Sequence, residues 1–110
     1  MISYGDQRAG DTPTASRGQA KWWETPEDHR FALEVLQLGL RRRILKLVAK
    51  EMKSIEEIEK EFDLGAAGAE YHLAMLEKAL VVERAEGGYR ATPTGILYLE
   101  KVEEKGPRGR

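Results

Sequence analysis

The sequence contains no cysteine among its 110 residues. This absence excludes disulfide bonds, metal sites with cysteine ligands and catalysis by a thiol. Aromatic residues are few, at 7%, so aliphatic side chains must fill most of a core. No apolar run approaches the roughly 20 residues of a membrane-spanning helix, and the start of the chain lacks the apolar segment of a signal peptide. We therefore expect a protein of the cytoplasm with no membrane partner.

Positive charge is also not in excess. The chain has 18 Lys+Arg against 19 Asp+Glu, a formal net charge of -1, so overall charge gives no argument for a nucleic-acid partner. The one concentrated basic feature is the run Arg41-Arg42-Arg43. The length allows a single domain of ordinary size.

Three segments are expected along the chain. Residues 1–21 are rich in small and polar residues without an apolar period, so we predict a flexible N-terminal tail over residues 1–24. We also predict a single domain over residues 25–105 and a frayed C-terminus over residues 106–110. Trp22 and Trp23 end the tail, and such a pair packs on a domain more often than it binds a ligand.

Several helix starts are marked by their sequence. Thr25 followed by Pro26 is typical of a helix cap and first turn, and Ser54 with Glu57 forms a capping-box pattern. Apolar residues then recur at helical spacing; in the fourth helix they are Ala69, Leu73, Leu76 and Leu80. The expected helices cover about residues 26–38, 40–52, 54–63, 66–79 and 93–105.

A β-hairpin is predicted between the last two helices. Gly87-Gly88 separates the β-prone stretch 80–86 from Tyr89-Arg90-Ala91-Thr92, which favours a two-residue turn with positive φ. In that register Glu86 lies opposite Tyr89, and Glu83 and Arg90 meet diagonally as a surface pair.

This order of elements resembles a known superfamily. Three segments are similar to motifs of ArsR-like regulators. They are Arg41-Arg42-Arg43-Ile44-Leu45 after Leu36, then Ser54-Ile55-Glu56-Glu57-Ile58, and finally Tyr71-His72-Leu73 with Leu76-Glu77 and Leu80-Val81. Thr92-Pro93-Thr94-Gly95 resembles the entry to the final helix of PadR- or MarR-like and small archaeal-type proteins. The resemblance implies a mainly α-helical winged helix-turn-helix, with a three-helix core, a small β-hairpin wing and a C-terminal helix.

The resemblance also implies a transcriptional regulator that binds double-stranded DNA as a homodimer. Helix 66–79 would enter the major groove, and the wing over residues 81–92 would reach adjacent backbone or the minor groove. Backbone amides at the helix start would bind phosphate. The candidate DNA-binding residues are Ala66, Ala67, Tyr71, Met75, Lys78, Arg84, Arg90, Arg41 and Arg43.

Each of these assignments has a structural alternative. Tyr71 either contacts phosphate or a base edge, or only covers Met75. Arg84 and Arg90 either neutralise phosphate or belong to an ordinary solvated hairpin. The arginines at 41–43 either contact the DNA backbone or form a solvated helix face.

The predicted reading face carries few polar groups. ArsR-like proteins usually have polar side chains where this chain has Ala66, Ala67, Gly68 and Glu70, and such side chains make the hydrogen bonds to base edges. An outward face of Ala, Gly, Tyr and Met suits a protein contact as well. The alternative function is therefore a winged-helix protein-interaction module with another protein as its partner.

Metal, cofactor and catalytic sites are not expected. His29 and His72 are the only histidines, they are far apart in sequence, and a packed or capping His72 is the simpler interpretation. Gly65-Ala66-Ala67-Gly68 lacks the Lys-Ser/Thr of a phosphate-binding loop. We therefore predict no enzyme.

The terminal helices are expected to form the dimer. They carry more apolar surface than one buried stripe needs, and in ArsR-like proteins such helices form the interface. The candidate interface residues are Trp22, Trp23, Phe31, Ile96, Leu97, Tyr98 and Leu99.

Overall fold

The computed structural model describes residues 22–105. All of the predicted tail except residues 22–24, and the predicted frayed end over residues 106–110, lie outside the described part. The elements in chain order are α3 (Pro26–Val35), α4 (Gly39–Lys50), α5 (Ile55–Phe62), α6 (Ala66–Lys78), β1 (Val82–Ala85), β2 (Gly88–Ala91) and α7 (Pro93–Lys105). None of these helices is both long and apolar enough to cross a membrane.

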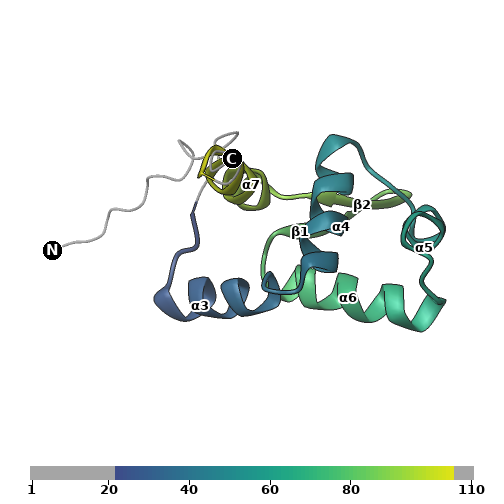
Figure 1. Cartoon of the computed structure of the whole chain (residues 1–110), viewed down its shortest axis with the longest axis horizontal. Helices are drawn as coiled ribbons and strands as arrows, with labels where there is room; N and C mark the ends of the chain where they lie inside the picture. Colours follow the sequence, from purple (N-terminus) through teal and green to yellow (C-terminus); the bar gives the residue numbers. More distant parts are fainter. Residues whose placement is uncertain (1–21, 106–110) are drawn as a thin grey trace, which may run out of the picture.

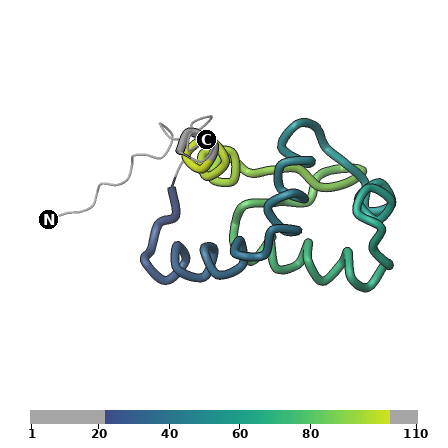
Figure 2. Tube along the Cα trace, viewed as in Figure 1, coloured from purple at the N-terminus to yellow at the C-terminus, as the bar shows by residue number. Residues whose placement is uncertain are grey.

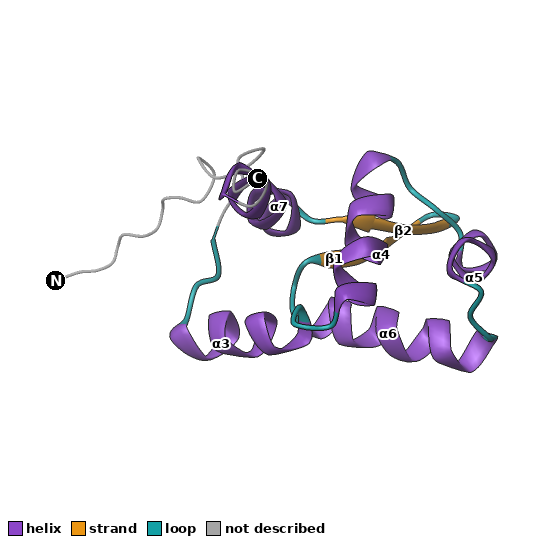
Figure 3. Cartoon of the chain, in the orientation of Figure 1, coloured by secondary structure: helices purple, strands orange, loops and turns teal. Residues whose placement is uncertain are grey.

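The elements surround α4. Figure 1 shows α3 and α6 along the lower edge, α5 at the right and α7 at the upper left, with α4 standing between them. Helix α4 packs against β2, α6 and α7, and α5 packs against α6. The two strands of the hairpin are the only strands in residues 22–105 (Figure 3). This is the mainly helical architecture with a small wing that the sequence predicts.

The predicted helix starts at Thr25 and Ser54 are confirmed. The Thr25 hydroxyl accepts a hydrogen bond of 3.0 Å from the Asp28 amide. The Ser54 hydroxyl accepts from the Glu57 amide at 3.1 Å, and the Glu57 carboxylate accepts from the Ser54 amide at 2.8 Å. That second bond lowers the pKa of Glu57, as expected for a carboxylate held by a donor.

The first described helix ends earlier than predicted. Helix α3 stops at Val35, whereas the sequence predicts a helix to about residue 38, and Leu38 is instead the N-cap residue of α4 with 48% of its surface exposed. Arg42 stabilises the turn that follows α3, because its guanidinium donates to the carbonyls of Leu36 at 2.6 Å and Gln37 at 3.1 Å. Leu36 is the C-cap residue of α3 and Gln37 follows it, so these bonds hold the chain where the helix has ended.

The core consists mainly of aliphatic side chains from α3 to α6 and the wing, and it also includes two aromatic residues, Trp23 and, from α7, Tyr98. Ala69, Leu73 and Leu76 of α6 are buried as predicted, but Leu80 is 47% exposed, so its predicted inward position is wrong. The reason is that α6 ends at Lys78 and Leu80 takes the left-handed conformation, with φ 68. The chain turns there, and Val81 takes the buried place.

The hairpin forms, but its turn and register differ from the prediction. Glu86 and Gly87 make the turn, Ala85 pairs with Gly88, and Glu83 lies directly opposite Arg90. Of the two glycines, only Gly87 has positive φ. Gly88 is instead a strand residue in close contact with another segment: a Cβ there would lie 2.3 Å from the Lys53 carbonyl oxygen. Tyr89, next to it, pairs with Lys53 through two backbone hydrogen bonds.

Candidate nucleic-acid interface

Helix α6 presents one open face. Burial of Ala69, Leu73 and Leu76 at steps of four and three turns the opposite side of the helix outward. The exposed residues of α6 are Ala66, Ala67, Glu70, Tyr71, Ala74 and Lys78. Met75, predicted to point outward, is half-buried against the core.

The N-terminus of α6 is open to solvent. Its N-cap residue, Gly65, has no side chain that could accept from the first amides, and no acidic residue occupies the first turn. Ala66 and Ala67 are exposed and small. The positive end of the helix dipole and its unsatisfied amides are therefore accessible to an anion.

Arg41 lies inside the molecule. Its side chain is 5% exposed; its Nε donates to Nδ1 of His72 at 3.1 Å and its Nη1 to the carbonyl of Val35 at 3.3 Å. The Tyr71 ring centroid lies 5.4 Å from the guanidinium carbon. Arg41 thus joins α3, α4 and α6, which corrects the expectation that it contacts the DNA backbone.

His72 is the acceptor in this arrangement. Its burial, together with the positive charge of Arg41, lowers the pKa of the imidazole below its ordinary value. The neutral ring can accept through Nδ1, whereas a protonated ring could not. Within the described residues no group of three or more histidine and acidic side chains could hold a metal.

Both wing arginines are exposed and paired. Arg90 Nε lies 2.8 Å from Glu83 Oε2, which confirms the pair expected from sequence. Arg84 Nε lies 3.1 Å from Glu77 Oε2 on α6, and its guanidinium lies over the Tyr89 ring at 5.6 Å. The Arg84–Glu77 salt bridge links the wing to α6, and no local sequence pattern predicts it.

Arg43 is separate from these residues. It is exposed on α4, where it lines one hollow with Tyr98 and Val102 of α7 and another with Glu61 and Phe62. No residue of α6 lines either hollow. The structure therefore does not place Arg43 with the α6 face.

The predicted dimer residues divide into three groups by exposure. Trp23 and Tyr98 are each 8% exposed and belong to the core of the chain. The Trp23 indole donates to the Ala79 carbonyl at 2.8 Å, and its ring meets Tyr98 edge-on at 6.3 Å. Trp22 and Ile96 are exposed, while the remaining three, Phe31, Leu97 and Leu99, are half-buried.

Comparison with known proteins identifies the architecture. No family model matches the chain, and no curated protein matches it. It is similar to a solution structure from Mycobacterium bovis, a homodimeric winged helix-turn-helix DNA-binding domain described as a possible ArsR-family transcriptional regulator. The match has 19% identity and a TM-score of 0.61, and it covers 77% of this chain and 91% of the other. The chain has the winged helix-turn-helix fold.

Proposed function

We propose that the chain is a transcriptional regulator that binds double-stranded DNA as a homodimer. The observation that carries this proposal is the open face of α6, with its uncapped N-terminus and its support by α5. This is how a helix-turn-helix presents its second helix to a major groove. The DNA-binding function of the M. bovis domain with the same fold supports it.

Each part of the surface has a role in this proposal. The amides of Ala66 and Ala67 bind a phosphate at the positive end of α6. Tyr71 and Lys78 are the main side-chain contacts in the groove. Arg41 and Met75 are left out of the contact surface because one is buried and the other half-buried.

The wing acts on the adjacent backbone or minor groove. Arg84 and Arg90 are held by glutamates in the free chain, but exposed ion pairs contribute little stability. Phosphate can therefore replace Glu77 and Glu83 as the partner of these arginines at small cost.

We expect the binding to be weak in sequence selectivity. The exposed first turn of α6 offers only methyl groups, which can touch a thymine methyl but make no hydrogen bond to a base edge. Glu70 is exposed on the same face and repels phosphate. Most of the affinity would then come from phosphate contacts and would fall steeply with salt.

Fluorescence anisotropy with a random-sequence duplex tests the proposal. Binding should weaken with salt in a linear log–log relation, and Arg84→Ala with Arg90→Ala should lower the slope by about two per subunit. The matched control is Arg43→Ala with Lys101→Ala, which removes two exposed charges from α4 and α7.

Three outcomes of this binding experiment would contradict parts of the proposal. Equal losses in the two double variants would indicate a general charge effect and contradict the wing contact. A folded protein that does not bind the duplex at low salt would refute DNA binding. A large change in preference between duplex sequences on removing Arg84 and Arg90 would contradict the low selectivity.

A further inference from the structure

A hollow forms where the chain enters the domain. Residues 22–25 run from beside α7 down to the start of α3 (Figure 2), and they border a cavity of about 290 Å³ with α3, α7 and the turn after α6. Its lining residues are Trp22, Trp23, Glu24, Asp28, Leu80 and Thr94. We call it the tryptophan pocket. Its volume is at the lower end of the range for small-molecule sites.

The walls of this pocket are aromatic and firmly held. The two indole rings meet edge-to-face, with centroids 4.8 Å apart and planes at 74°. Trp23 is anchored by its hydrogen bond to Ala79, and His29 stacks on it at 5.1 Å. Trp22 remains 39% exposed beside it. Because Trp23 is only 8% exposed, the indole surface open to a ligand is mainly that of Trp22.

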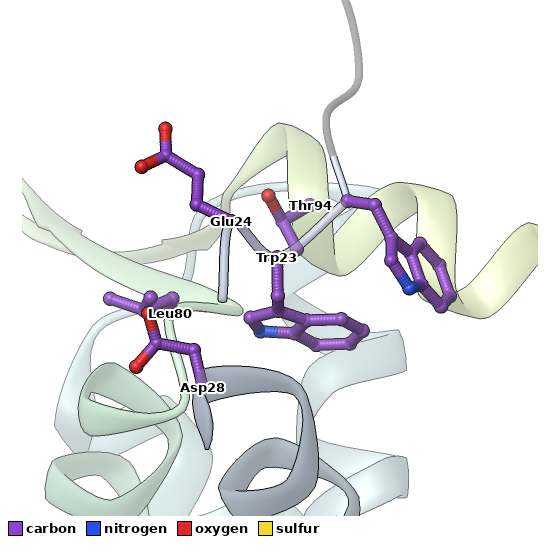
Figure 4. Close-up of a pocket in the computed structure, with 6 residues that line it drawn as sticks. Trp23, Glu24, Asp28, Leu80 and Thr94 are labelled. Atoms are coloured by element: carbon purple, nitrogen blue, oxygen red, sulfur yellow. The ribbon is translucent and has the colours of Figure 1, made fainter. Parts of the chain in front are cut away.

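The charge of the lining has one sign. Two carboxylates, Glu24 and Asp28, line the pocket, and among the described residues 22–105 no basic side chain lines it. Figure 4 shows Asp28 and Leu80 together on one side of the Trp23 ring, whereas the Glu24 side chain extends away from that ring. Negative charge beside indole rings is the combination that attracts an organic cation, through ion pairing and cation–π contact.

Leu80 supplies the apolar part of the pocket rim. It is a bulky residue with φ 68, a conformation that is costly for a branched side chain. The Thr92 hydroxyl holds it there by donating to the Leu80 carbonyl at 2.8 Å. The result is an exposed apolar side chain at the pocket rim, where the body of a ligand would cover it.

We propose that the tryptophan pocket binds a small organic cation. Its charged head group pairs with Asp28, and its apolar body lies against Trp22, Trp23 and Leu80. This site is separate from the α6 face, so it does not depend on DNA binding. It does need an accessible Trp22, so Trp22 then lies outside the candidate dimer interface.

Intrinsic fluorescence tests this directly, because the only two tryptophans of the chain line the pocket. The probe is choline, titrated at constant ionic strength. Its control is the neutral alcohol in which a tert-butyl group replaces the trimethylammonium group. We expect a saturable fluorescence change with choline and about tenfold weaker binding of the neutral alcohol.

Two matched variants assign the charge. Asp28→Asn should weaken choline binding about fivefold or more, whereas Glu27→Gln, which removes a neighbouring charge outside the pocket, should leave it within about twofold. Trp22→Leu should also weaken binding, with Trp23 still reporting. Circular dichroism checks that each variant is folded.

Three results would overturn the proposal. The first is the absence of a saturable change with choline in the wild-type protein. The second is equal affinity for the neutral alcohol, which would mean a purely apolar pocket. The third is an equal effect of Asp28→Asn and Glu27→Gln, which would mean general electrostatics and no local pairing.

Discussion

Arg41 carries its charge inside the molecule, between α4 and α6. The side chain donates to a backbone carbonyl and to an imidazole, and it lies near an aromatic ring. A buried guanidinium requires such partners, because an unpaired buried charge is very costly. The run of three arginines therefore contains three different roles: a core residue, a cap for α3 at Arg42, and an exposed cation at Arg43.

The Arg41–His72 contact predicts a pH dependence of stability. Because the pKa of His72 is lowered in the folded chain, the unfolded chain binds the proton more readily. Stability is then fully present above the ordinary histidine pKa of about 6.5 and is lost as the pH falls below it. Urea unfolding at about pH 7.5 and about pH 5.5 measures this loss.

The control for this prediction is His72→Asn. An asparagine can accept from Arg41 through its side-chain oxygen and does not titrate. We expect a smaller loss of stability on acidification in this variant than in the wild type. The same pH dependence in both proteins would contradict the assignment to His72.

At the scale of elements, the wing illustrates how a distant segment sets a local geometry. A pair of glycines suggests a turn centred on both, yet the turn uses Glu86 and Gly87. Gly88 lies in strand β2, where the absence of a side chain lets the strand approach the backbone of Lys53 and form the Lys53–Tyr89 bridge. The two glycines thus serve different needs, positive φ at Gly87 and close approach at Gly88.

Two glycine substitutions should have opposite effects. Gly88→Ala places a Cβ 2.3 Å from the Lys53 carbonyl oxygen, so we expect a destabilisation of about 1–3 kcal/mol. Gly68→Ala lies in helix α6 with nothing within 4 Å of the new Cβ, so we expect a gain of about 0.5–1 kcal/mol. Thermal unfolding measures both, and unchanged stability of Gly88→Ala would contradict the close approach.

At the scale of the whole molecule, exposed apolar side chains remain on the terminal helices. Leu33 on α3 and Ile96 and Val102 on α7 are each about two-fifths exposed, at 42%, 40% and 38%. Such side chains favour self-association when they gather on one surface. A homodimer would also supply two α6 helices, which bind DNA about one helical turn apart in proteins of this kind.

The dimer is tested by changing one of these side chains. Ile96→Asp places a charge in the predicted interface and should convert a dimer into a folded monomer, as measured by light scattering. Leu38→Asp is the matched control, because Leu38 is 48% exposed at the N-cap of α4 and lies outside the predicted interface. A monomeric wild-type protein at high micromolar concentration would refute the dimer.

The sequence by itself determined the elements whose causes are local. The caps at Thr25 and Ser54 join residues three positions apart. The apolar spacing of α6, as far as Leu76, identifies the face of the helix that is buried. These interactions need only neighbours along the chain, so they can be recognised without a structure. They predict the order of the helices, and the resemblance of this order and its motifs to ArsR-like regulators implied the fold.

Only the tertiary structure decided the features that join distant segments. Arg41 meets His72 31 positions away, and Trp23 reaches Ala79 across 56 positions. The same is true of the hairpin register, which depends on Lys53, and of the pocket that unites the tryptophans with Asp28 and Leu80. Such contacts depend on how whole elements pack, and a one-dimensional pattern does not specify which of many possible partners will lie close in space.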